Sequence, residues 1–316
     1  MGNYKLIVLE IIMVKIAVLM STYNGEKYIK EQLESIISQN LDADMYLHIF
    51  IRDDCSNDST KEIALSYSDH VTWIDGKNNI GPARSFFELM LNVSGYDYYF
   101  FSDQDDFWDL NKVKKMVAAF GHNDNPKIIF SNALLVNKKG KSLNKYCFSK
   151  APNTNFYTLS SCGGIPGCTM CFNNSLQTIF QKRGNYISCI KMHDNYLLSL
   201  CSAVGGEITM INEPLTYYRQ HDNNTIGVAV DHRTKNKQVV KLLKKFSGVH
   251  VSQQVKDIYD NFSEMICPQF FQWIVLLSKT NDSFLCRLRI AFSPKIHLFP
   301  LRHSIFVRTL ILFNKR

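Results

Sequence analysis

Three carboxylates, Asp103, Asp105 and Asp106, are packed into four consecutive positions of the chain. Aromatic residues typical of a buried strand precede them at 96–101, and an apolar pattern of helical period follows Asp109. The carboxylates therefore belong to the turn where a strand ends. Because carboxylates this close repel one another, a hard cation with oxygen ligands is the usual means of stabilising them. The simpler alternative is a solvated acidic turn in which Asp109 caps the next helix.

The segments before this turn alternate between strand and helix patterns. Strand patterns occur at 15–20, 47–52 and 71–75, and each is followed by a polar turn and an apolar pattern of helical period, the first with Asn24 as its expected N-cap. This alternation predicts an α/β fold with a mostly parallel sheet flanked by helices. Ligands bind beyond the carboxyl ends of the strands in such sheets, so the polar turns should meet at one edge. No G-x-G-x-x-G follows the first strand, which argues against a nicotinamide or flavin enzyme.

The alternation weakens after residue 120. The expected elements there are strands at 128–136, 168–172 and 207–211, a helix that opens near Asp194, and a last segment at 215–221. A long loop rich in Ser, Asn and Gly separates the first two of these strands, and we expect it to bind an acceptor.

Charge and cysteine content limit the class of protein. Residues 235–316 contain 14 Lys and Arg against four Asp and Glu, a local charge of +10, so residues 1–234 carry −2 of the net +8. Nine cysteines is an odd number in 316 residues, which favours reduced thiols in the cytosol. Cys168 and Cys171 have C-x-x-C spacing without a second pair, so we expect small buried residues on a strand and not a zinc or redox site. No uninterrupted apolar run is long enough to span a bilayer, and we expect no signal peptide.

Six short motifs occur in a fixed order within residues 13–228. They are STYNG at 21–25, RDDCS at 52–56, NIG at 79–81 with Arg84, SDQDDFW at 102–108, His193-Asp194, and YRQHDNN at 218–224. In these motifs the chain resembles the inverting GT-A glycosyltransferases of family 2, and among them the bacterial rhamnosyltransferase-like group. The resemblance implies a GT-A domain at 13–230 and a basic, mainly helical extension at 231–316. One departure is Cys55, where such proteins often carry glycine.

The resemblance implies a nucleotide-sugar site made of residues from several motifs. The residues that match donor contacts are Thr22, Tyr23, Asp53, Asp54, Arg84, Asp103 and Arg219. Asp54 would accept a hydrogen bond from the pyrimidine ring, with Asp53 as the second choice, and Asp103 would contact the ribose. Taken alone, each of these residues could instead be a turn, capping or surface ion-pair residue.

The resemblance also implies a metal site and a catalytic base. Asp105 or Asp106 would bind the Mg²⁺ or Mn²⁺ that bridges the two phosphates, with His221 as a further metal or phosphate contact. Asp194 would take the proton from the acceptor hydroxyl as it attacks the anomeric carbon in a single inverting displacement. Without the resemblance, Asp194 would be read as a helix cap and His221 as a structural histidine.

We therefore expect a metal-dependent glycosyltransferase of bacterial surface polysaccharide assembly, with dTDP-L-rhamnose as donor. The acceptor would be a growing glycan carried on polyprenyl diphosphate. A UDP-hexose donor is the alternative within the class, and a non-catalytic sugar-nucleotide or glycan-binding protein is the alternative outside it. We expect a cytoplasmic protein whose basic helical extension, with Lys241, Lys244, Lys245, Arg302 and Arg308, either rests on an anionic membrane surface or packs on the catalytic domain. Nucleic-acid binding is not expected.

Overall fold

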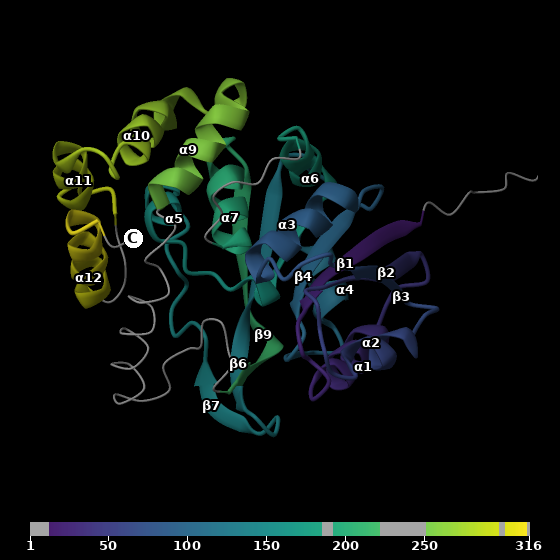
Figure 1. Ribbon diagram of the computed structural model, residues 1–316. Coiled ribbons are helices and arrows are strands. Elements are labelled where there is room, and N and C mark those ends of the chain that lie inside the picture. Colours follow the sequence, from purple (N-terminus) through teal and green to yellow (C-terminus); the bar gives the residue numbers. More distant parts are fainter. Residues whose placement is uncertain (1–12, 185–191, 222–250, 297–300, 315–316) are drawn as a thin grey trace, which may run out of the picture.

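The structure, a computed structural model, describes residues 13–184, 192–221, 251–296 and 301–314 (Figure 1). The first part of the chain contains β1 (Val14–Thr22), α1 (Ile29–Ile37), β2 (Met45–Asp53), α2 (Thr60–Leu65), β3 (Val71–Asp75), α3 (Pro82–Asn92), β4 (Tyr98–Asp103), β5 (Phe107–Trp108) and α4 (Lys112–Ala118). The middle part contains β6 (Lys127–Asn137), β7 (Ser142–Tyr146), α5 (Phe156–Cys162), the 3-10 helix η1 (Gly167–Thr169), β8 (Met170–Asn173), α6 (Asn174–Gln181), α7 (His193–Ala203) and β9 (Glu207–Gln220). The last part contains α9 (Val251–Phe262), the 3-10 helix η2 (Ser263–Met265), α10 (Pro268–Ser278), α11 (Phe284–Ala291) and α12 (Leu301–Leu312).

The strands form one nine-stranded sheet in the order β3-β2-β1-β4-β8-β6-β9-β5, with β7 paired to β6. The block β3-β2-β1-β4 is parallel throughout, as the alternation predicted. Beyond β4 the sheet is mixed, because β8 runs antiparallel to both β4 and β6, while β6 and β9 are parallel. The predicted fold class is confirmed, and its parallel part is the block that ends in the acidic turn.

Helices cover both faces of the sheet, so the central strands are apolar on both sides (Figure 1). In β1, Ala17 and Leu19 pack into the core shared with α3, α6 and α7, whereas Ile16 and Val18 pack into the core shared with α1, α2 and α4. Side chains alternate across a strand, so a continuous apolar run fills two cores. The two cores hold the parallel block rigid and fix where its carboxyl ends lie.

The C-terminal helices pack on the same face as α7 (Figure 1). Buried side chains of α9, α10 and α11, among them Val255 and Ile274, belong to the core that contains Leu19. Asp257 of α9 accepts hydrogen bonds from Arg183 Nε at 3.0 Å and from the Tyr196 hydroxyl at 2.6 Å. The C-terminal helices are thus joined to the rest of the chain by apolar packing and by a buried ion pair. The division at residue 230 stays a prediction.

Three local predictions were wrong. Asn24 is not the N-cap of α1: that position is Tyr28, and Asn24 adopts φ 47° while its side-chain oxygen accepts the Asn57 amide at 2.8 Å. The long loop before β8 contains β7 and α5. The segments at 207–211 and 215–221 form one strand, β9, whose register shifts around Pro214, because proline is tolerated in a strand at a bulge.

The basic character expected of the C-terminal helices is only partly visible. Lys241, Lys244 and Lys245 lie outside the described residues, as does the side chain of Arg302. Arg308 is half-buried, and its guanidinium donates to main-chain oxygens of Ala291, Ser293 and Ile296 at 2.5, 2.9 and 3.0 Å. It caps the end of α11 and does not belong to a solvated basic face. In the part of the chain that the structure describes, no helix combines the length and apolarity needed to cross a membrane.

Candidate active site

The carboxyl ends of three parallel strands meet at one edge of the sheet. Thr22 at the end of β1 is paired in register with Asp53 of β2, and Ser21 is paired with Asp103 of β4. The turns that follow these strands therefore lie side by side. The predicted convergence of polar residues at this edge is confirmed, and we refer to it as the rim.

Hydrogen bonds within the protein saturate the carboxylates of the turn after β2. Asp54 is buried and accepts from Arg52 Nη1, from the Ile80 amide and from the Gly81 amide, each at 2.7 Å. It thus pairs with a buried cation and also accepts from the amides of the two residues just before α3, at the end of the helix where the dipole favours a negative charge. The geometry holds this turn and the start of α3 as one unit.

Asp53 is bound by its own turn. Its carboxylate accepts from the Thr22 hydroxyl at 3.0 Å, and from the Ser56 amide at 2.8 Å and hydroxyl at 2.5 Å. Between Asp53 and Ser56 lies Cys55, with φ 68°. Only glycine adopts this left-handed conformation without strain, so glycine would suit this position better than cysteine. Cys55 nevertheless adopts the conformation, at the cost of some backbone strain.

A glutamine joins the β1 and β4 turns. Gln104 Oε1 accepts the Tyr23 amide at 2.9 Å, and Gln104 Nε2 donates to the Tyr23 carbonyl at 3.0 Å. The side chain of Tyr23 is left free to face solvent, with 47% of the residue exposed. The middle residue of the acidic turn thus fixes the backbone of the residue that the resemblance places beside the nucleotide base.

The acidic turn itself is held from the end of β9. The Arg219 amide donates to Asp106 Oδ1 at 2.8 Å, and the Arg219 guanidinium donates to the Asp105 carbonyl at 2.7 Å and to Glu31 at 2.5 Å. The same guanidinium lies over the Tyr28 ring, 4.7 Å from its centroid. Arg219 is 1% exposed, so these contacts account for much of its hydrogen-bonding capacity. Its predicted role as a donor contact stays a prediction.

His221 and Asp105 form an outer pair at the rim. His221 Nε2 lies 2.7 Å from Asp105 Oδ2, and the imidazole stacks on Tyr28 with ring centroids 5.2 Å apart. Imidazole nitrogen and carboxylate oxygen are both ligands of divalent metals. The sequence placed both residues in the metal site, and the structure brings them into contact across 116 positions of the chain.

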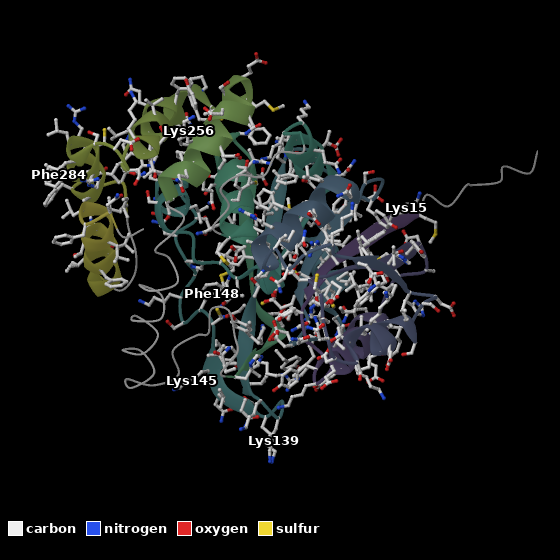
Figure 2. All side chains as sticks on the ribbon, viewed as in Figure 1. Lys15, Lys139, Lys145, Phe148, Lys256 and Phe284 are labelled. Atoms are coloured by element: carbon white, nitrogen blue, oxygen red, sulfur yellow. The ribbon has the colours of Figure 1, made fainter. Side chains whose placement is uncertain are left out.

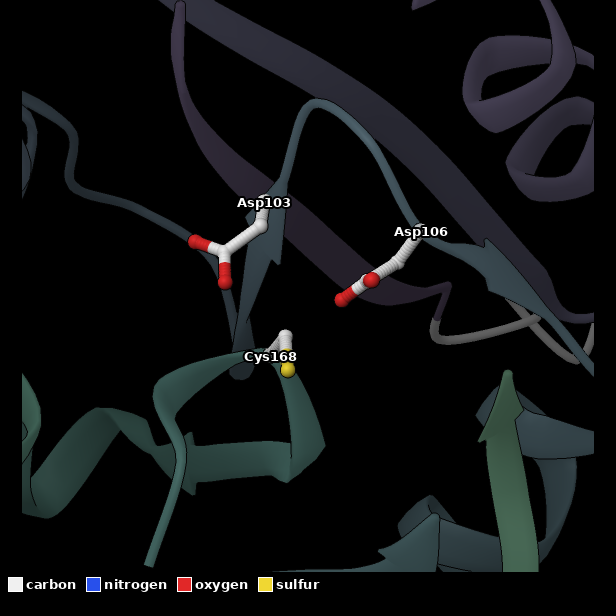
Figure 3. Close-up of side chains that lie close together, drawn as sticks. All are labelled: Asp103, Asp106 and Cys168. Atoms are coloured by element: carbon white, nitrogen blue, oxygen red, sulfur yellow. The ribbon is translucent and has the colours of Figure 1, made fainter. Parts of the chain in front are cut away.

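Asp103 and Asp106 face inward, toward a residue that the sequence did not single out for this site. One ligand atom each of Asp103, Asp106 and Cys168 lie within 4.8 Å of one another, and Figure 3 shows the three side chains close together. Burial and the neighbouring Asp105 and Asp194 carboxylates raise the pKa of Asp103 to about 7. Burial, with Asp105 and Asp103, raises the pKa of Asp106 well above its ordinary value. We call these three residues the inner cluster.

A buried lysine lies beneath the inner cluster. Lys112, at the start of α4, is 0% exposed. Its ammonium donates to the Cys168 carbonyl at 2.7 Å and to the Thr216 hydroxyl at 3.0 Å, and lies 3.9 Å from the centroid of the Trp108 ring. Burial lowers the pKa of Lys112 to about 8, while the charges of Asp106 and Asp103 oppose this shift. Sequence reasoning missed Lys112 because it looked like one more polar residue of an amphipathic helix.

The candidate base is Asp194, on the first turn of α7. It is half-buried, and it accepts the Asn195 amide at 2.6 Å and the Gly167 amide at 3.2 Å. Burial raises its pKa to about 6. Asp194 lies in the first turn of α7, but the N-cap is Met192, so Asp194 is not the cap that the simpler interpretation expected. Its raised pKa makes it a carboxylate that can accept a proton near neutral pH.

The histidine before this base is packed and uncharged. His193 stacks on Phe86 with ring centroids 3.9 Å apart, and burial lowers its pKa to about 3. A Cβ on Gly167 would lie 2.6 Å from His193 Nε2, so a side chain at 167 would displace the imidazole. Gly167 therefore allows η1 to approach α7 closely enough to bond Asp194.

The structure places the remaining predicted residue, Arg84, on the exposed first turn of α3, next to the amides that bind Asp54. Cys168 and Cys171 are both buried, the first in η1 and the second in β8. The predicted roles of Thr22, Tyr23 and Arg84 in donor binding stay predictions.

Comparisons with known proteins agree with this arrangement. The profile of Glycosyl transferase family 2 matches residues 17–180. The chain is 32% identical over 254 residues to dTDP-rhamnosyl transferase RfbG of Shigella flexneri, which covers 77% of this chain and 85% of that protein. It is 24% identical over 296 residues to an uncharacterized glycosyltransferase of Haemophilus influenzae, which covers 89% of this chain and 97% of that protein.

Solved structures support the fold. S. aureus TarS in complex with UDP superimposes with a TM-score of 0.53 at 16% identity, covering 95% of this chain and 90% of that one. The mannosyltransferase PcManGT of Pyrobaculum calidifontis, in complex with GDP-Man and Mn²⁺, gives a TM-score of 0.53 at 12% identity, covering 95% and 74%. The chain belongs to glycosyl transferase family 2 and is a glycosyltransferase of GT-A fold.

Proposed function

We propose that the protein transfers L-rhamnose from dTDP-L-rhamnose to a growing glycan, with inversion at the anomeric carbon. The observation that carries the proposal is the position of Asp194 on the same rim as the acidic turn. Asp194 is close enough for its charge to raise the pKa of Asp103. A base at this distance from the donor site can accept the proton of an acceptor hydroxyl as it attacks the sugar. The 32% identity to a dTDP-rhamnosyl transferase supports the choice of donor.

Each side of the rim would have a separate task. Thr22, Tyr23 and the β2 turn would bind the nucleoside, with Asp54 or Asp53 facing the pyrimidine. Arg84 and Arg219 would lie toward the diphosphate, and Asp103 would contact the ribose. Hydrogen bonds within the protein already hold both turns. Donor binding would therefore require little further ordering of these turns, and this favours affinity.

The outer pair fits a divalent metal. Asp105 Oδ2 and His221 Nε2 converge at the rim, and Asp106 lies beside them in the turn. Mg²⁺ or Mn²⁺ bound there would neutralise the charge that builds on the departing nucleoside diphosphate. The 2.7 Å contact between Asp105 and His221 would give way to two metal bonds, and stacking on Tyr28 would keep the imidazole oriented.

The experiment that tests the proposal compares donor turnover by the wild type and by Asp194→Asn. Release of dTDP from dTDP-L-rhamnose, with a glycan acceptor and Mn²⁺, should fall by about 10² to 10⁴ in kcat in the variant, while dTDP binding persists. The wild-type rate should also fall about tenfold per pH unit below the pKa of about 6, since protonated Asp194 cannot act as a base. Near-normal turnover by the variant would remove Asp194 from this role, and no turnover by the wild type would overturn catalysis itself.

A UDP-hexose donor remains the second candidate within the class, because a TarS structure of the same fold contains UDP-GlcNAc. A panel of dTDP- and UDP-sugars in the same assay separates the two. A protein that binds a sugar nucleotide with Mn²⁺ but releases no nucleoside diphosphate would instead be a non-catalytic binding protein.

We further propose that the acceptor is carried on polyprenyl diphosphate at the cytoplasmic face of a membrane and that α11 and α12 rest on that surface. Large apolar residues are exposed on both helices, and Figure 2 shows Phe284 at the outer edge of the molecule. They are Phe284, Leu285, Phe292, Ile305, Phe306 and Phe313. Residues 268–314 contain six Lys and Arg but one acidic residue, Asp282, a charge that suits anionic lipid. Co-sedimentation with anionic vesicles should fail for Phe284→Ser/Phe292→Ser, and equal binding by this variant would exclude α11.

A further inference from the structure

The inner cluster has a ligand set that differs from that of the outer pair. Two carboxylates and one thiol, from Asp103, Asp106 and Cys168, place their ligand atoms within 4.8 Å of one another. Asp106 and Cys168 are 0% and 1% exposed, and Asp103 is half-buried at the end of β4. The outer pair contributes an imidazole and a carboxylate from different residues, His221 and Asp105.

One atom of the cluster is buried without a hydrogen-bond partner among the described residues. Asp106 Oδ1 accepts the Arg219 amide, but Asp106 Oδ2 has no such partner. Figure 3 shows the Asp106 carboxylate pointing toward Asp103 and the Cys168 sulfur. A buried carboxylate oxygen in this state costs free energy unless a cation or a donor meets it. The unpaired oxygen therefore points to a ligand between the three side chains.

From this arrangement we propose that Asp103, Asp106 and Cys168 bind a second divalent cation, behind the one that the outer pair would hold. The ligand would be a cation of borderline softness, such as Zn²⁺ or Cd²⁺, because thiolate sulfur favours these ions over Mg²⁺. Binding would break the S–H bond of Cys168, form a metal–sulfur bond and release the proton to solvent. The proposal uses different residues from the catalytic role of the outer pair and does not depend on the donor sugar.

Charge balance supports a divalent ion. With both carboxylates and the thiolate ionised, the cluster carries three negative charges, and the buried ammonium of Lys112 beneath it contributes one positive charge. Two negative charges remain, which a divalent cation neutralises. Neutrality matters here because an uncompensated charge is expensive in a site that excludes water.

The backbone that carries the Cys168 sulfur is anchored by hydrogen bonds. The Cys168 carbonyl accepts from Lys112 Nζ at 2.7 Å and from the Thr216 hydroxyl at 3.3 Å, so the residue is anchored on two other elements. On the next turn, the Thr169 hydroxyl donates to the Pro166 carbonyl at 2.7 Å. A ligand held this firmly loses little freedom when a metal binds, as metal sites require.

The experiment uses the full-length protein, stripped of metal and reduced, titrated with Cd²⁺. We expect the ultraviolet charge-transfer absorption of a Cd–S bond to appear and to saturate at one ion per chain. Cys168→Ser should abolish this absorption, and Asp106→Asn should weaken Cd²⁺ binding by at least about tenfold. Zn²⁺ should displace Cd²⁺, whereas Mg²⁺ should not.

Cys171→Ser is the matched control, because Cys171 is equally buried, three positions away on β8, and outside the cluster. It should leave the absorption unchanged. The absence of a Cd–S absorption in the wild type, or its persistence in Cys168→Ser, would overturn the proposal. If Cys168→Ser does not fold, loss of binding in a folded Asp106→Asn decides in favour of the cluster, and unchanged binding there decides against it.

A variant of the outer pair distinguishes metal binding by the inner cluster from the proposed catalytic function. His221→Gln should lose metal-dependent turnover and retain the Cd–S absorption. A wild type that shows the absorption but releases no nucleoside diphosphate would support the inner site and contradict the catalytic proposal. Turnover without the absorption would do the reverse.

Discussion

The carboxylates of the two acidic turns at the rim differ in the hydrogen-bond donors that the protein supplies to them. In the turn after β2, Asp53 and Asp54 each accept three hydrogen bonds, and Asp54 also pairs with the buried cation of Arg52. In the turn after β4, Asp106 has one oxygen with a main-chain donor and one without a partner among the residues that the structure describes. In the first turn, the protein itself supplies hydrogen-bond donors to both carboxylates. In the second turn, it supplies too few.

This difference separates a structural role from a binding role on the two strands that flank β1. Donors from the protein stabilise the ionised form of a carboxylate, whereas burial without donors raises its pKa and makes it ready for a cation. The β2 turn can thus present a fixed surface to a nucleoside. The β4 turn keeps negative charge that the proposed metal ions would neutralise. The cost in stability would lie where these ions bind, as is common at functional sites.

The largest loss of stability should come from removing a carboxylate of the turn after β2. Asp54→Ala removes a partner of Arg52, whose side chain is 3% exposed, and the acceptor of the Ile80 and Gly81 amides. We expect a loss of about 3–5 kcal/mol in the free energy of unfolding, measured by urea denaturation. Asp75→Ala is the control, since its ion pair with Lys61 is exposed and should contribute at most about 1 kcal/mol. A loss below about 1 kcal/mol at Asp54 would mean that Glu88 and solvent alone can hold the guanidinium.

The opposite response is expected in the β4 turn. In metal-free protein, the folded-state pKa of Asp106 lies above its unfolded value near 4, so the folded form binds the extra proton and stability falls as the pH rises above about 4. Asp106→Asn removes this loss and keeps the Arg219 contact. We expect the variant to gain about 1–3 kcal/mol at pH 8 and nothing near pH 4, from thermal unfolding at both pH values. A variant less stable than the wild type at pH 8 would contradict the contrast between the turns.

A smaller effect on stability should come from the backbone conformation of Cys55, in the turn after β2. Cys55 has φ 68°, a conformation that costs a residue with a Cβ about 1 kcal/mol. Cys55→Gly should therefore be more stable than Cys55→Ala by about that amount, although both variants lose the weak bond from the Cys55 thiol to the Gly76 carbonyl. Equal stability of the two variants would show that the turn relaxes to remove the strain.

Sequence reasoning predicted the parallel block and its rim because these follow from local patterns. The strand patterns at 15–20, 47–52 and 71–75 correspond to β1, β2 and β3, and the carboxylates lie at the ends of the strands they follow. Parallel pairing then brings the ends together whatever the side chains are. In the β2 turn, only the bonds from Ser56 to Asp53 and from Arg52 to Asp54 are local. The bonds from Thr22, Ile80 and Gly81 span 31, 26 and 27 positions, and they follow from the arrangement of the strands and of α3.

The inner cluster could not be predicted in this way. Cys168 meets Asp103 only because β8 enters the sheet antiparallel to β4, and Lys112 meets Thr216 across 104 positions. Nothing in the local pattern around 168 distinguishes a ligand from a small core residue. The same holds for β9, which the sequence divided into segments at 207–211 and 215–221, because only the pairing with β6 shows that the strand continues through bulges.

The amide of Gln104 gives the rim one more property. Its two hydrogen bonds to the backbone of Tyr23 join the β1 turn and the acidic turn into a single mechanical unit. A cation that shifted the acidic turn would also shift Tyr23. The affinities for the proposed metal and nucleotide would then be thermodynamically linked, and each ligand would change the affinity for the other by the same factor. Such cooperativity would follow from one uncharged side chain between two aspartates.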